Sequence, residues 1–229
     1  MEQLPLVILL LYALYEGIIH AFEADHILAV TNIVSQRTTL LPAIKDGIFW
    51  GLGHTSTIFF VGIIMIVFKV HIPEGAFSYF EAAVGFMLIF VASYRLYIFL
   101  RDEQTALKFH KHKHEHAGEN TYLHTHIHLK DKNLHKASYG IGIIHGLAGS
   151  GALVVLIMTQ IESVASSVLY LAIFGIGSIA GMTCVAGIFS VPFSKKILSS
   201  KLLRTLLVII SSGLCFAYGC YVVYQNLLV

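Results

Sequence analysis

Charged side chains are scarce in this sequence. They make up 12% of its 229 residues, whereas 56% are hydrophobic and the mean hydropathy is +0.76. A soluble domain usually carries about 25% charged residues. Asp, Glu, Lys and Arg are absent from four stretches, 47–68, 137–161, 163–194 and 205–229, each of which is long enough to cross a bilayer. We therefore expect most of the chain to fold in lipid.

Several motifs are also missing. The three cysteines form no C-x-x-C pair and lie in apolar runs, so we interpret them as small packing residues. A redox carrier would need paired cysteines, which argues against that class. The G-x-x-x-x-G-K-[ST] phosphate loop and the H-E-x-x-H motif are absent, which argues against nucleotide hydrolysis by that route and against a metal-dependent hydrolase. The first residues lack the basic region of a secretory signal, and we expect them to remain in the first helix.

The continuous apolar runs predict an all-α membrane protein with six transmembrane helices. The six predicted spans are 4–34, 47–70, 76–100, 137–160, 164–192 and 203–227. We expect three parts: residues 1–100 as a first group of three helices, residues 101–136 as a polar insert, and residues 137–229 as a second group of three.

Lysine and arginine predict the orientation of these spans. All but one of the 15 basic residues fall in the loops after the first, third and fifth spans or at the edges of those loops; the exception is Lys69. Basic residues concentrate on the cytoplasmic side of membrane proteins. We therefore expect a plasma-membrane protein with both termini outside the cytoplasm and the insert inside it.

The two halves of the chain resemble each other. Residues 17–30 align without gaps with residues 142–155, with six identities in fourteen pairs, and Gly51-Leu52-Gly53 matches Gly175-Ile176-Gly177. A repeat offset by three spans enters the membrane from opposite sides. Many secondary transporters are built on such inverted repeats and place their substrate site at the repeat interface. We predict a 3+3 inverted repeat.

Ionisable residues gather in the first predicted span. Glu16, His20, Glu23, Asp25 and His26 lie within eleven residues. An ionised Asp at the centre of a membrane helix costs roughly 2.5–3.5 kcal/mol. These groups are therefore either neutral and hydrogen-bonded to neighbouring helices, or they bind a cation. Imidazole and carboxylate together suit Ni, Co, Zn or Mn, which favours a metal site.

A straight helix would not bring this cluster to one ion. At 100° per residue, Asp25 lies about 140° and His26 about 240° from His20 around the helix axis. The span is also too long, because 31 residues would extend about 46 Å across a core of about 30 Å. We therefore predict that the first helix is kinked or unwound near residues 20–26.

Two further histidines lie deep in predicted spans. His54 follows Gly-Leu-Gly in the second span, and His145 is the repeat partner of His20. A single membrane histidine is often an interhelical hydrogen-bond donor, but the cluster in the first span makes both of them candidate ligands. The second half has Ala148, Ser150 and Gly151 where the first has Glu23, Asp25 and His26, so it has lost its charges.

The segment His20-Ala-Phe-Glu-Ala-Asp25-His26 resembles the H-x4-D-H signature of the nickel–cobalt transporter superfamily. The triplet Gly53-His54-Thr55 and the segment from His145 to Gly151 resemble its short, UreH-like urease-accessory branch. This resemblance implies permeation of Ni²⁺ or Co²⁺, with His20, Asp25 and His26 essential and His54 contributing. The superfamily includes longer members with eight spans and exporters with histidine-rich loops, so the direction of transport stays open.

The polar insert is rich in histidine. Eight of the thirteen histidines fall within 26 residues. They are His110, His112, His114, His116, His124, His126, His128 and His135. The composition is typical of a disordered, metal-binding segment. Such a loop in the cytoplasm would collect imported ions, present ions for export or sense metal; the alternative is a solvated basic tether between the halves.

These observations predict a secondary transporter and not an enzyme. Inward movement of a divalent cation gains about 4.6 kcal/mol per 100 mV of membrane potential, so we favour import. Export would need a second driving force, such as proton exchange through Glu16 or Glu23. The expected partners are the metal ion, the lipid bilayer and, from the resemblance, nickel-enzyme maturation proteins such as those of urease. We expect no nucleic acid and no prosthetic group.

Overall fold

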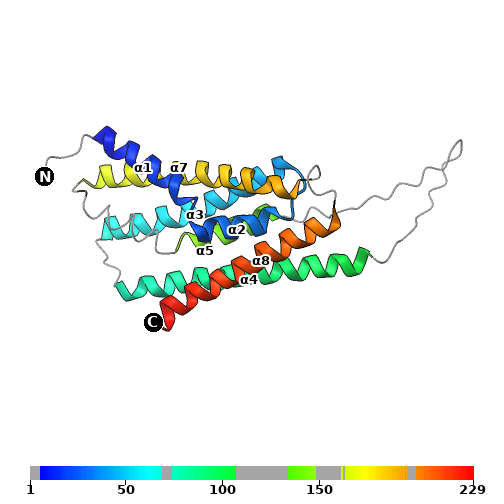
Figure 1. Cartoon of the computed structure of the whole chain (residues 1–229). Helices are drawn as coiled ribbons and strands as arrows, with labels where there is room; N and C mark the ends of the chain where they lie inside the picture. The colour runs from blue at the N-terminus through cyan, green and yellow to red at the C-terminus, as the bar shows by residue number, and fades with distance from the viewer. Residues whose placement is uncertain (1–5, 69–73, 107–133, 148–160, 162, 195–199) are drawn as a thin grey trace, which may run out of the picture.

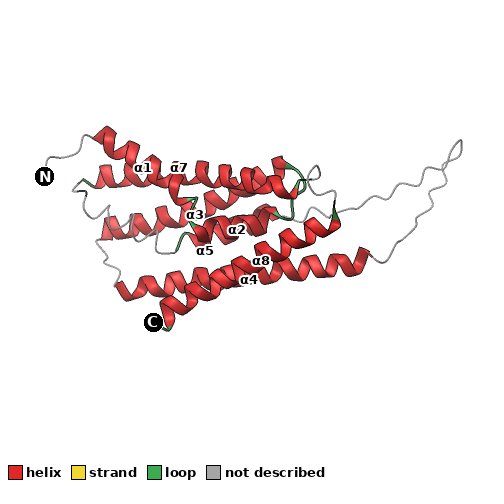
Figure 2. Cartoon of the chain, viewed as in Figure 1, coloured by secondary structure: helices red, strands yellow, loops and turns green. Residues whose placement is uncertain are grey.

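The computed structural model describes residues 6–68, 74–106, 134–147, 161, 163–194 and 200–229. These residues are helical apart from short connections, and no strand occurs among them (Figure 2). The helices are α1 (Leu6–His20), α2 (Ala24–Val34), α3 (Leu40–Phe68), α4 (Glu74–Ala106), α5 (Leu134–His145), α7 (Val164–Ser190), the 3₁₀ helix η1 (Val191–Phe193) and α8 (Lys201–Leu227). Helices are expected here because lipid cannot hydrogen-bond an exposed backbone.

Four of these helices are long and apolar enough to cross a membrane. They are α3, α4, α7 and α8, and the bent pair α1–α2 makes a fifth candidate span. The remaining predicted span, 137–160, begins in α5, but residues 148–160 lie outside the described part of the chain. The structure is therefore an all-helical, membrane-type protein, while the number of six spans stays a prediction.

The predicted interruption of the first span is confirmed. α1 ends at His20, α2 begins at Ala24, and their axes differ by 55°. The backbone N–H groups of Phe22 and Glu23 bond to carbonyls only three residues back, at 2.8 and 3.1 Å, instead of four. Glu23 is extended, with φ −63° and ψ 154°, and its carbonyl starts the next helix by accepting from Ile27 at 3.0 Å. The chain thus turns between two segments that carry candidate ligands.

The helices pack as two groups (Figure 1). α1 lies against α7, and α3 packs between α7 and α5, whereas α4 and α8 pair with each other. The short helix α2 contacts α4, α7 and α8 and so connects the two groups. Trp50 of α3 is fully buried in the main core together with residues of α2, α4 and α7. At the interruption after His20, Phe22, Glu23 and Ala24 are exposed, whereas His20, Ala21 and His26 on either side of them are buried.

Glycines allow the closest helix contacts. A Cβ atom on Gly17 would lie 2.2 Å from the carbonyl oxygen of Phe174, so α1 and α7 touch through their backbones. A Cβ atom on Gly142 would lie 2.2 Å from the carbonyl oxygen of Trp50, which brings α5 equally close to α3. Only glycine fits at these two positions. Both contacts lie within one turn of a candidate ligand, His20 in the first case and His145 in the second.

Candidate metal centre

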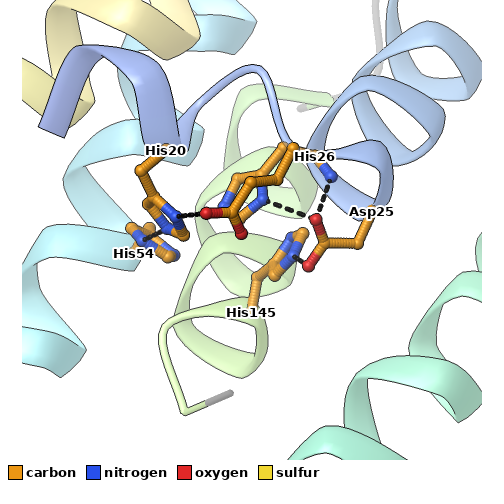
Figure 3. A network of polar contacts seen from close by, with 6 residues as sticks. His20, Asp25, His26, His54 and His145 are labelled. Atoms are coloured by element: carbon orange, nitrogen blue, oxygen red, sulfur yellow. Dashed lines mark hydrogen bonds and ion pairs between the residues drawn. The ribbon is translucent and has the colours of Figure 1, made fainter. Parts of the chain in front are cut away.

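Four histidines and one aspartate meet in the interior of the bundle (Figure 3). His20 is the last residue of α1, Asp25 and His26 lie in the first turn of α2, and His54 and His145 come from α3 and α5. The interruption between α1 and α2 is what lets His20 and His26 face each other, because an unbroken helix would separate them. His26, His54 and His145 are fully buried, His20 is 4% exposed, and the side chain of Asp25 is 20% exposed.

The first group within this cluster is made of imidazoles only. His20, His26 and His54 each offer a ligand nitrogen, and these nitrogens lie within 4.8 Å of one another. The Nε2 atoms of His20 and His54 are 3.1 Å apart. The ring of His26 stands edge-on to both, with centroid distances of 4.3 Å to His20 and 5.2 Å to His54.

The second group centres on Asp25. Its Oδ1 lies 2.9 Å from Nδ1 of His26, and its Oδ2 lies 3.0 Å from Nε2 of His145. The rings of His26 and His145 stack with centroids 4.0 Å apart. Asp25, His26 and His145 form the second set of three side chains that could hold an ion, so His26 belongs to both sets.

The two glutamates predicted for the site differ in their placement. Glu23 lies at the break, where its Oε1 is 2.9 Å from Nδ1 of His20 and its side chain is 51% exposed. Glu16 lies one turn before His20 on α1 and belongs to neither set of potential ligands among the described residues. The structure therefore brings together six of the seven predicted core residues. The seven predicted ligands of the insert, His110 to His128, lie outside the described residues.

Three buried ring nitrogens of the cluster have no hydrogen-bond partner among the described residues. They are Nε2 of His26 and the Nδ1 atoms of His54 and His145. Leaving a buried polar atom unpaired costs about 1–3 kcal/mol. Such atoms are costly in a core that has only a packing role.

Sequence reasoning missed the tryptophan that lines this cluster. Trp50 lies one turn before His54 on α3, and its ring centroid is 5.5 Å from those of both His26 and His145. The only signal in the sequence was the spacing of four residues, which places both side chains on one face of the helix.

Sequence reasoning also missed a buried ionic cluster made of Arg37, Asp46 and His135. Asp46 is fully buried and accepts from Nε of Arg37 at 2.6 Å and from Nδ1 of His135 at 2.6 Å. Its position one turn before Trp50 places Asp46 on the same face of α3 as His54. His135 is thus a structural partner of Asp46 at the start of α5, rather than a residue of the insert alone.

The fold and the site together define a class: a helical, membrane-type protein with a buried imidazole–carboxylate cluster at the break of a span. The sequence is 33% identical over 205 residues to the urease accessory protein UreH of Bacillus sp. (strain TB-90). The aligned residues make up 89% of this chain and 84% of that protein. The chain belongs to the family of this urease accessory protein. No family model and no solved structure matches the chain. Membership in a family of accessory proteins agrees with the expectation that the chain is not an enzyme.

Proposed function

We propose that this protein carries Ni²⁺, or Co²⁺, across the plasma membrane through the cluster at the α1–α2 break. The observation that carries the proposal is the convergence of four buried imidazoles and Asp25 inside a helical membrane-type bundle. Nitrogen and carboxylate donors suit these metals. Intramembrane ionisable groups usually mark ion pathways, because burying them without that use is costly.

The kinship with a urease accessory protein supports nickel as the cargo. The relative is named a urease accessory protein. Together with the resemblance of residues 20–26 to the nickel–cobalt transporter signature, this name favours a protein that supplies nickel to an enzyme. Maturation proteins of urease, or of another nickel enzyme, are therefore the proposed recipients. The H-x4-D-H pattern of residues 20–26 points the same way, because its three polar residues are among those that meet in the cluster.

The spacing of the cluster suits a first-row divalent ion. Metal–imidazole bonds are about 2.1 Å long, so two ligand atoms at right angles around one ion lie about 3.0 Å apart. The Nε2 atoms of His20 and His54 are 3.1 Å apart. Square-planar or tetragonal arrangements with right angles are those that Ni²⁺ favours among nitrogen and oxygen ligands.

Matched glycine contacts support a 3+3 inverted repeat. A Cβ atom on Gly53 of α3 would lie 2.2 Å from the carbonyl oxygen of Tyr139 in α5. A Cβ atom on Gly177 of α7 would lie 2.4 Å from the carbonyl oxygen of Leu14 in α1. Gly53 and Gly177 are repeat partners, and Leu14 and Tyr139 stand at nearly the same offset, so the repeat relates two contacts that each join one half to the other. With α4 and α8 as a third matched pair, the proposed arrangement has six spans, and its halves would rock about the ion.

The arginines support a cytoplasmic location for the insert. Arg95, near the end of the third predicted span, and Arg204, at the start of the last, both lie over the ring of Phe99, at 5.6 and 6.0 Å from its centroid. Arg95 also bonds to the carbonyl oxygen of Ser35 at 3.2 Å, next to Arg37 in the loop after the first span. Basic residues of three loops therefore gather at one end of the bundle, as the positive-inside rule requires.

The test is metal flux into liposomes that contain only this protein, under imposed membrane and pH gradients, with Ni²⁺, Co²⁺, Zn²⁺ and Mn²⁺ compared. We expect Ni²⁺ or Co²⁺ uptake driven by an inside-negative potential, and its loss in His20→Ala and Asp25→Ala. Ser56→Ala, an exposed polar position two residues after His54, is the matched control and should transport normally. Uptake that survives both site variants would end the proposal. Flux that follows an opposing proton gradient would instead assign export, and metal binding without flux would assign a sensor.

A further inference from the structure

The two nitrogens of each imidazole have different roles in this cluster. A neutral histidine carries hydrogen on one ring nitrogen and a lone pair on the other. Only the lone pair can bind a metal ion, so the hydrogen-bond partner of one nitrogen decides which atom is the ligand.

Glu23 determines this choice for His20. Oε1 of Glu23 lies 2.9 Å from Nδ1 of His20, and an ionised carboxylate can only accept a hydrogen bond. Nδ1 of His20 therefore carries the hydrogen. Nε2 is left with the lone pair, and this atom faces Nε2 of His54 at 3.1 Å.

Asp25 does the same for His26. Oδ1 of Asp25 lies 2.9 Å from Nδ1 of His26, so this nitrogen is the donor. Nε2 of His26 holds the lone pair, and it is fully buried with no partner among the described residues. Two successive carboxylate–imidazole pairs, Glu23 with His20 and Asp25 with His26, thus present their Nε2 atoms in the same way.

The oxygens of Asp25 are already occupied by donors. Oδ1 accepts from the backbone N–H of His26 at 2.9 Å as well as from its ring, and Oδ2 accepts from Nε2 of His145 at 3.0 Å. Coordination of a metal by Asp25 would have to displace one of these bonds. Coordination by the three histidines breaks only the contact between His20 and His54, in which Nε2 of His54 is the donor. His54 frees this nitrogen for the ion by carrying its hydrogen on Nδ1, which is buried with no partner among the described residues.

We infer that the ion is bound by the Nε2 atoms of His20, His26 and His54, and that Glu23 and Asp25 are positioning residues that act through Nδ1. His145 belongs only to the second set of potential ligands, not to the set of three histidines, so it holds Asp25 in place and does not coordinate the ion. This inference rests on the proposed function and assigns the roles within its site. A ligating histidine commonly donates its second N–H to a carboxylate, and losing that carboxylate typically lowers metal affinity 10- to 100-fold without removing the site.

The experiment is X-ray absorption at the nickel edge on the purified full chain, combined with Ni²⁺ titration. The wild-type spectrum should show three imidazoles. Asp25→Asn and Glu23→Gln should keep three imidazoles and bind Ni²⁺ about 10- to 100-fold more weakly. Glu23 is half-exposed, so Glu23→Gln remains informative even if Asp25→Asn folds poorly.

Two histidine variants complete the test. His54→Ala should remove one imidazole from the spectrum, whereas His145→Ala should keep all three. A lost imidazole in His145→Ala, or loss of an oxygen ligand in Asp25→Asn, would overturn the inference and assign the set Asp25, His26 and His145 as the ligands. A wild-type protein that binds no Ni²⁺ at this cluster would instead contradict the proposed function.

Discussion

At the scale of a single residue, Gly142 shows how the packing of the helices positions the polar cluster. It lies on α5 three residues before His145, and its backbone touches Trp50, whose ring in turn lies beside His145. The position of the helix that carries His145 thus depends on the absence of one methyl group. Gly17 has the same role for α1 before His20.

We expect Gly142→Ala to destabilise the protein by about 1–3 kcal/mol, since the added methyl group would meet a backbone carbonyl that cannot rotate away. Gly140→Ala is the matched control, because it lies on the same helix with nothing within 4 Å of the added atom. Thermal unfolding of the two variants in detergent measures the difference. Equal midpoints would mean that α5 and α3 do not touch at this glycine.

The candidate residues could be predicted from the sequence, but their pairing could not. Histidines and carboxylates in apolar segments are conspicuous because burying them is costly. Which nitrogen faces which oxygen depends on how four helices meet, and the separation of 120 residues between Asp25 and His145 carries no local signal. Trp50 was missed because one tryptophan in an apolar run is indistinguishable from ordinary core.

At the scale of helices, the ionic cluster of Arg37, Asp46 and His135 joins elements that also carry residues of the buried histidine–aspartate cluster. Arg37 follows α2, Asp46 lies on α3, and His135 lies on α5. Asp46 and His54 are eight residues apart, which is about 12 Å along a helix. Two polar clusters at that separation therefore fix the relative position of α2, α3 and α5.

We expect Asp46→Asn to destabilise the protein by about 3–5 kcal/mol, because it removes one charge of a buried ion pair with Arg37. Lys45→Gln neutralises a charge at the neighbouring, exposed position and should have little effect. Chemical or thermal unfolding with an intrinsic tryptophan signal would measure both. A small effect of Asp46→Asn would show that Arg37 does not need this carboxylate.

The break of the first span could be predicted because two simple quantities agreed: the angular spread of the ligands and the length of the apolar run. The angle between α1 and α2 could not be predicted from the sequence, since the bend depends on contacts of α2 with α4, α7 and α8. The ends of α5 and the fourth predicted span depend on residues outside the described part, so that prediction stays untested.

At the scale of the whole molecule, the histidine-rich insert and the buried cluster are expected to bind metal independently. We expect deletion of residues 108–130 to lower the number of Ni²⁺ ions bound per chain while flux through liposomes persists. The deletion stops before His135, since that residue pairs with Asp46. Replacing the insert's seven histidines from His110 to His128 by glutamine, with the length kept, separates metal binding from tethering. Unchanged stoichiometry in both variants would identify the insert as a tether.

The exposure of Glu23 has a consequence for the ion itself. At the break, a half-exposed carboxylate stands next to His20, which is almost fully enclosed. A hydrated divalent cation would meet this negative charge while most of its water shell is still intact. We expect dehydration to proceed in steps, with each departing water replaced by a protein atom before the next one leaves.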